Sequence, residues 1–95
     1  MKAINLLSAT NKIESLASEF VKVETVNIQF RKRFSNKEHN SLEATVSYLE
    51  DGKTTNFTVY VYAFMEELTI ENLYKNVKEK LKEFSVEQKN KKLLA

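Results

Sequence analysis

Apolar side chains recur along the chain with two different periods, and each period predicts one kind of secondary structure. The spacing of one helix face is shown by Ile13, Leu16, Ala17 and Phe20. It predicts a helix over about residues 11–21, with a turn of helix near residues 2–7 as an optional lead-in. Asn11 is suited to cap this helix within a capping box, and Thr10 or Ser8 are alternative caps.

A period of two follows and predicts two strands, each with one face in the core. In the first strand the inward side chains are those of Val26, Ile28, Phe30 and Phe34, and the outward ones those of Asn27, Gln29, Arg31 and Arg33. In the second strand the inward side chains are those of Leu42, Ala44, Val46 and Tyr48. A polar loop, SNKEHN, separates the two strands.

The dipeptide Asp51-Gly52 predicts a tight hairpin after the second strand. Asp-Gly between two β runs favours a type I′ turn, because both central residues need a positive φ. This turn sets Glu50 opposite Lys53, and every inward residue of the second strand then meets an inward residue of the third. The third strand is therefore the run NFTVYVYAF, with Phe57, Val59, Val61 and Ala63 facing the core.

A second helix is predicted at the C-terminus. Its apolar stripe consists of Ile70, Leu73, Val77, Leu81 and Phe84. Thr69 is suited to the N-cap, and Glu71 places a negative charge near the positive end of the helix dipole. We expect the helix to run from about residue 70 to 84, with a continuation to about 90, and residues 91–95 to fray.

The element order α-β-β-β-α and the length of 95 residues predict one small α+β domain over residues 1–95. Sequential strands joined by short connections favour a three-stranded antiparallel meander with the second strand in the middle. The apolar face of such a sheet needs cover, so we expect both helices to pack on the sheet.

Composition narrows the chemistry that the chain can perform. It contains no cysteine, no proline, one glycine and one histidine. A disulfide framework and a thiolate metal site are therefore excluded, and a single glycine cannot form a glycine-rich phosphate loop. His39 lies in a polar loop and is interpreted as solvated. We expect no metal, no cofactor and no catalytic site, and a cytoplasmic protein without a membrane segment.

The outward face of the third strand is the predicted surface with the strongest reason to contact another molecule or segment. Tyr60, Tyr62 and Phe64 all fall on it, and exposed aromatic rings of this size form an unusual surface patch. With Arg31 and Arg33 they make a candidate protein-binding surface. Three candidates could cover this surface: the chain's own N-terminal INLL, a protein partner or second copy of the chain, and nucleic acid. Arg31 or Arg33 can alternatively pair with Glu43 in a row that ends at Tyr60.

Nucleic acid is the alternative ligand. The net charge of +2 is too small to indicate it alone, but Arg31, Lys32, Arg33 and Lys37 cluster in one region, and the tail KNKKLLA is basic. The element order resembles that of the double-stranded RNA-binding domain, which implies phosphate contacts from the start of the last helix. Here that helix begins with Glu71 and Asn72, its first lysine is Lys75, and the loop SNKEHN lacks the family's glycine.

The character of the chain, short and rich in Lys, Asn and Glu, resembles small accessory proteins of low-GC bacteria and their phages. We therefore expect a non-catalytic regulator, inhibitor or assembly factor that binds another protein or itself through the outward sheet face.

Overall fold

The computed structural model describes the backbone of residues 6–32 and 39–94 and the side chains of residues 7–32 and 39–84. In chain order the elements are α1 (Leu6–Ser18), β1 (Lys22–Arg31), β2 (Ser41–Glu50), β3 (Lys53–Tyr62) and α2 (Ile70–Leu94). The strands form one antiparallel sheet in the order β1-β2-β3. The predicted α+β meander is therefore confirmed.

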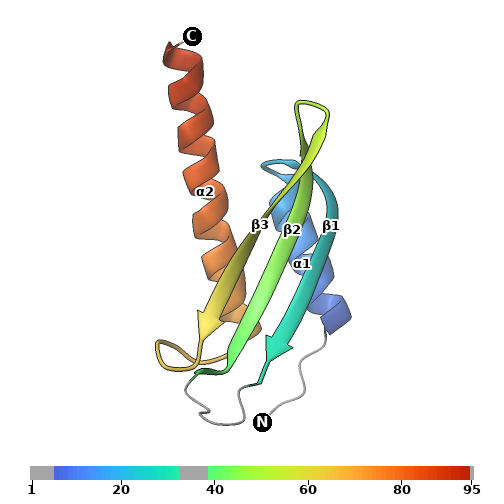
Figure 1. The fold of residues 1–95 in the computed structure, drawn as a ribbon, viewed down its shortest axis with the longest axis vertical. Coiled ribbons are helices and arrows are strands. Elements are labelled where there is room, and N and C mark those ends of the chain that lie inside the picture. Colours follow the sequence, from blue (N-terminus) through green and yellow to red (C-terminus); the bar gives the residue numbers. More distant parts are fainter. Residues whose placement is uncertain (1–5, 33–38, 95) are drawn as a thin grey trace.

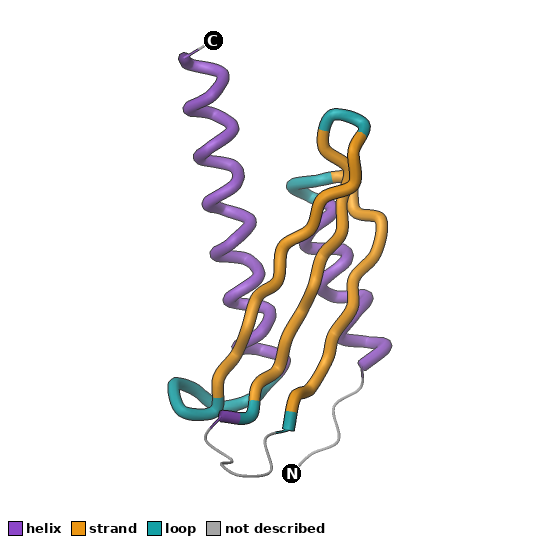
Figure 2. Tube along the Cα trace, in the orientation of Figure 1, coloured by secondary structure: helices purple, strands orange, loops and turns teal. Residues whose placement is uncertain are grey.

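The molecule has two layers (Figure 1). Both helices lie on one face of the sheet, α1 behind β1 and α2 along β3 (Figure 2). The opposite face, called the outer face below, carries no helix. Part of α2 continues past the sheet, and the molecule measures 49 × 24 × 20 Å along its principal axes.

The β2–β3 hairpin has the predicted register at every position. Glu50 pairs with Lys53, Val46 with Phe57, and Leu42 with Val61. Asp51 has a φ of 52° and Gly52 a φ of 77°, as a type I′ turn requires. Local turn chemistry and the apolar alternation specify the same pairing. A one-residue slip would turn the core residues of the slipped strand to the outer face.

Replacing Gly52 with alanine is expected to lower the free energy of unfolding by about 1–2 kcal/mol, because an L-residue with a Cβ disfavours positive φ. No atom lies within 4 Å of a Cβ built at this position, so the cost is conformational rather than steric. Gly52→Asn should cost less, since asparagine tolerates this region. Urea unfolding of the three proteins tests this, and equal stability of the alanine variant would contradict it.

The core lies between the sheet and the two helices. Its buried apolar residues are Ala9, Ile13, Leu16 and Ala17 from α1, Ile28, Leu42, Ala44, Val46, Tyr48, Phe57, Val59 and Val61 from the sheet, and Leu73, Val77 and Leu81 from α2. The rings of Tyr48, Phe57 and Phe84 close the core near the hairpin, with centroids 5.3–6.0 Å apart. The predicted apolar faces are thus the faces that the fold buries.

The first helix begins earlier than predicted. It runs from Leu6 to Ser18, so Ser8, Thr10 and Asn11 lie inside it and none is the N-cap. The prediction was wrong because it gave weight to a capping preference, whereas burial of Ala9 extends the apolar stripe toward the N-terminus. The predicted turn at residues 2–7 lies mostly outside the described residues.

The first strand also differs from its predicted limits. It begins at Lys22 and ends at Arg31, while Arg33 and Phe34 lie outside the described residues. A register shift between Val23 and Thr25 leaves Glu24 as an extra residue in the strand. This bulge interrupts the alternation of side chains, which explains why the period of two is visible only from Val26 onward.

Helix α2 is longer than predicted. Thr69 acts as the N-cap, because its Oγ1 accepts a hydrogen bond from the N–H of Asn72 at 3.2 Å. The helix ends at Leu94, so residues 91–94, which were predicted to fray, are helical. A run of helix-favouring lysine, glutamate and glutamine without proline or glycine is consistent with this extension.

Phe30 is the main exception among the predicted core residues. It pairs with the buried Leu42 and therefore lies on the helix side of the sheet, yet 40% of it is exposed. β1 is an edge strand, so a side chain near its end has neighbours on one side only. Sequence alternation correctly predicts its face and overestimates its burial.

Candidate interaction site on the outer sheet face

Three aromatic rings form a continuous row at one end of the outer face. Tyr60 and Tyr62 stack with their centroids 5.4 Å apart and their planes 11° apart. Phe64 continues the row at 5.4 Å from Tyr62, although it lies in the turn after β3 and not in the strand. The exposed fractions of these residues are 41%, 37% and 58%. The row is therefore accessible to a ligand along its whole length.

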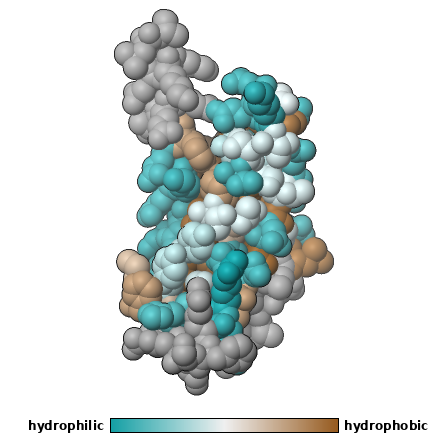
Figure 3. Space-filling view, in the orientation of Figure 1, coloured by the Kyte–Doolittle hydropathy of each residue, from teal (hydrophilic) through white to brown (hydrophobic). Residues whose placement is uncertain are grey.

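Met65 adds a fourth exposed apolar side chain in the same loop as Phe64. It is 72% exposed and directly follows Phe64. We call Tyr60, Tyr62, Phe64 and Met65 the aromatic patch. Figure 3 shows apolar side chains gathered over the loop that follows β3, at the lower left of the outer face. Much of the sheet surface in this view is hydrophilic or nearly neutral.

The loop that carries Phe64 and Met65 is held by backbone hydrogen bonds. The N–H groups of Met65 and Glu66 both donate to the carbonyl of Tyr62 at 3.0 Å. The N–H of Ala63 donates to the carbonyl of Asn40, also at 3.0 Å, which ties the loop to the residue before β2. The exposed side chains therefore stand on an ordered backbone.

Asn76 of α2 supports the same loop from behind. Its Nδ2 donates to the carbonyl of Tyr60 at 3.0 Å and to Oε1 of Glu66 at 2.8 Å. Nδ2 of Asn72 donates to the carbonyl of Glu67 at 2.7 Å. These bonds connect α2, the edge of β3 and the loop, so the helix fixes the position of the aromatic patch. Neither asparagine was predicted from the sequence, because polar residues on a helix give no periodic signal.

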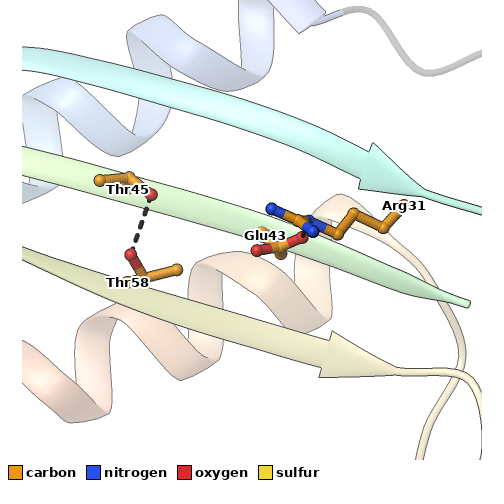
Figure 4. A network of polar contacts seen from close by, with 4 residues as sticks. All are labelled: Arg31, Glu43, Thr45 and Thr58. Carbon is orange, nitrogen blue, oxygen red and sulfur yellow. Dashed lines mark hydrogen bonds and ion pairs between the residues drawn. The ribbon is translucent and has the colours of Figure 1, made fainter. Parts of the chain in front are cut away.

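An ion pair lies next to the patch on the same face. Arg31 at the end of β1 reaches across β2, and its Nε lies 2.5 Å from Oε2 of Glu43 (Figure 4). Gln29 is the direct partner of Glu43 in the sheet, so Arg31 is its diagonal neighbour. Tyr60 pairs with Glu43 from the other side. The predicted row from arginine through Glu43 to Tyr60 is present, with Arg31 as the arginine.

Glu43 is buried even though it lies on the outer face. Only 7% of the residue is exposed, while the side chain of Arg31 is 56% exposed. Oε2 of Glu43 is fully buried and accepts no hydrogen bond, because the short contact with Arg31 Nε is not directed along an N–H bond. The carboxylate thus has a charge partner and lacks a hydrogen-bond partner at this oxygen.

The rest of the outer face is dominated by hydroxyl and amide side chains. Thr45 and Thr58 share a hydrogen bond of 2.9 Å across β2 and β3 (Figure 4). At the hairpin end, Thr54 donates to Oε1 of Glu24 at 2.5 Å. The first contact joins neighbouring strands, and the second joins β3 to the bulge of β1 across β2. Both support a structural role for this half of the face.

A hollow of about 310 Å³ opens between the ion pair and the aromatic patch. Its lining consists of Arg31, His39, Ser41, Glu43, Tyr60 and Tyr62. His39 also contacts Phe64 edge-on, with centroids 6.4 Å apart. The histidine was interpreted as a solvated loop residue; it is exposed, and the fold also places it beside the patch. No sequence signal indicated this contact, because it joins two different loops.

Four of the five residues predicted for partner binding meet at this end of the outer face: Arg31, Tyr60, Tyr62 and Phe64. Arg33 and the alternative nucleic-acid residue Lys37 lie outside the described residues. The predicted N-terminal cover INLL is described only from Leu6 onward, where α1 starts on the opposite side of the sheet. Leu7, on this helix, therefore does not cover the patch.

A second depression, of about 420 Å³, lies between the helices. It is lined by Asn11, Lys12, Ser15, Leu16, Glu19 and Tyr74. It contains no contiguous row of exposed rings, so we place the candidate site on the outer face. Among the residues whose side chains are described, 7–32 and 39–84, no group of three or more His, Asp or Glu residues is arranged to hold a metal ion. Among the described helices, none combines the length and apolar character needed to span a bilayer.

Comparison of the chain with protein-family models, with curated proteins and with solved structures found no match in any of the three.

Proposed function

We propose that this protein is a small non-catalytic binding domain that attaches to another protein, or to a second copy of itself, through the aromatic patch. The observation that carries the proposal is the continuous row Tyr60–Tyr62–Phe64, extended by Met65 and left exposed. Covering large apolar side chains stabilises a complex by about 1.5–3 kcal/mol for each one fully removed from water. Aromatic residues and methionine are also enriched at protein interfaces.

The ordered loop strengthens this proposal. Because Asn76 and the backbone bonds to Tyr62 already hold the loop, a partner would order few residues on binding. Association then loses less conformational entropy than it would with a mobile loop. A regulator, inhibitor or assembly factor is the functional class that fits a single binding surface on so small a domain. A phage or other mobile element is the proposed origin, and the cytoplasm the proposed location.

The test is capture of partners from the native host with three purified proteins: the wild type, a Tyr60→Ser/Tyr62→Ser variant and a Leu7→Ser control. Leu7 is 72% exposed on α1, far from β3 in the fold, so the control removes an exposed apolar side chain elsewhere. If the partner is another protein, we expect the wild type and the control to capture the same proteins. If it is a second copy of the chain, we expect them to self-associate equally in sedimentation. The double variant should lose whichever property the wild type shows, while its circular dichroism is unchanged.

Unchanged capture and unchanged self-association by a folded double variant would contradict the assignment. The alternative, nucleic-acid binding through Arg31, Lys32, Arg33 and Lys37, has a separate signature. It predicts binding of single-stranded or double-stranded RNA that weakens steeply with salt, because phosphate contacts release counterions.

A further inference from the structure

Two residues of the hollow's lining are restricted to one hydrogen-bonding role. Arg31 can only donate, through its guanidinium N–H groups, and Glu43, when ionised, can only accept. The other lining residues, His39, Ser41, Tyr60 and Tyr62, each carry a group that can donate or accept. The charge of the ligand that fits the hollow therefore depends on which of the two charged groups is accessible.

The two charges at the hollow are not equally accessible. Glu43 is 7% exposed, and its Oε2 lies beneath Arg31, whereas more than half of the Arg31 side chain is open to solvent. Arg31 makes no other ion pair among the described residues, so its two terminal nitrogens remain available. A charged ligand that enters the hollow meets the guanidinium before it meets the carboxylate.

The ion pair also orients the guanidinium. Nε of Arg31 lies against Oε2 of Glu43, and the two side chains meet on the outer face (Figure 4). An arginine held in this way loses less side-chain entropy when it binds a planar anion. Carboxylates fit the guanidinium through two parallel hydrogen bonds.

From this accessibility and charge we infer that the hollow binds the carboxylate of an acidic side chain on the partner protein. The inference rests on the proposed function and names the chemistry that the partner presents. Terminal nitrogens of Arg31 donate to the carboxylate, with hydroxyl or imidazole donors of the lining around it. An apolar residue next to the acid on the partner lies over Phe64 and Met65. A basic side chain in the same position would be repelled by Arg31.

Titration of the 15N-labelled protein with three blocked tripeptides, Phe-Glu-Phe, Phe-Gln-Phe and Phe-Lys-Phe, tests the inference. We expect the glutamate peptide to shift the resonances of Arg31, Ser41 and Tyr62, and to bind about tenfold more tightly than the glutamine peptide. The lysine peptide should bind most weakly. Raising the salt concentration should reduce binding of the glutamate peptide and leave that of the glutamine peptide unchanged.

An Arg31→Lys variant supplies a second measurement, because lysine keeps the charge beside Glu43 and removes the planar fork. Its preference for the glutamate over the glutamine peptide should fall several-fold. Equal binding of glutamate and glutamine peptides at Phe64 and Met65 would overturn the carboxylate inference and leave the proposed protein-binding function intact. The inference would also be overturned if no peptide binds or if the lysine peptide is preferred. The same holds if inorganic phosphate binds at the hollow more tightly than the glutamate peptide.

Discussion

Replacing Leu42 with alanine is expected to lower the free energy of unfolding by about 3 kcal/mol, within the range of about 2–5 kcal/mol for such core truncations. Leu42 is fully buried in the central strand, where it pairs with Phe30 on one side and Val61 on the other. The two flanking strands hold their positions, so the cavity left by the truncation cannot fully collapse. Urea unfolding followed by circular dichroism measures the change.

The matched control is Leu7→Ala, the same truncation at a residue that is 72% exposed. We expect it to change stability by no more than about 0.5 kcal/mol. A similar loss for both variants would show that Leu42 is not packed in the core as the fold describes. A chain of this size has a total stability of about 5–15 kcal/mol, so the Leu42 variant should stay mostly folded in water and unfold at a lower urea concentration than the wild type.

The second large effect concerns the ion pair at the candidate site. Arg31→Leu should lower the free energy of unfolding by about 1–2 kcal/mol, because it leaves the Glu43 carboxylate buried without a charge partner. Water replaces part of the lost interaction, since the arginine side chain is 56% exposed, and this keeps the loss below that of a fully buried pair.

The double variant Arg31→Leu/Glu43→Leu separates this cause from lost packing. Removing both charges should restore stability to within about 0.5 kcal/mol of the wild type, or above it. A double-mutant cycle completed with Glu43→Leu measures the coupling directly. If the double variant is less stable than Arg31→Leu alone, an uncompensated carboxylate is not the source of the loss.

The location of the candidate site could be predicted from the sequence in part. Alternation assigns Tyr60 and Tyr62 to the outer face, and the Asp51-Gly52 turn sets Tyr60 opposite Glu43; both were confirmed. Met65 was missed because it lies beyond the strand, where no period applies. His39 was interpreted from its polar neighbours alone, and its contact with Phe64 depends on the packing of two loops.

The burial of Glu43 was also beyond sequence reasoning. A glutamate on the polar side of an alternating strand is normally solvated, and the pattern correctly predicts its side. Glu43 is only 7% exposed because its two cross-strand neighbours have large side chains. Arg31 of β1 lies over it, and Tyr60 of β3 pairs with it on the other side. Whether long side chains cover or avoid a neighbour depends on their rotamers in the assembled sheet.

The amino-acid sequence by itself determined the element order, the hairpin register and the faces that enter the core, because these follow from local turn chemistry and from the periods of strand and helix. Tertiary structure decided the earlier start of α1, the bulge at Glu24, and the site in which Asn76 holds the loop behind an exposed row of rings. The physical reason is that these features depend on contacts between segments distant in the chain, and no local period records such contacts.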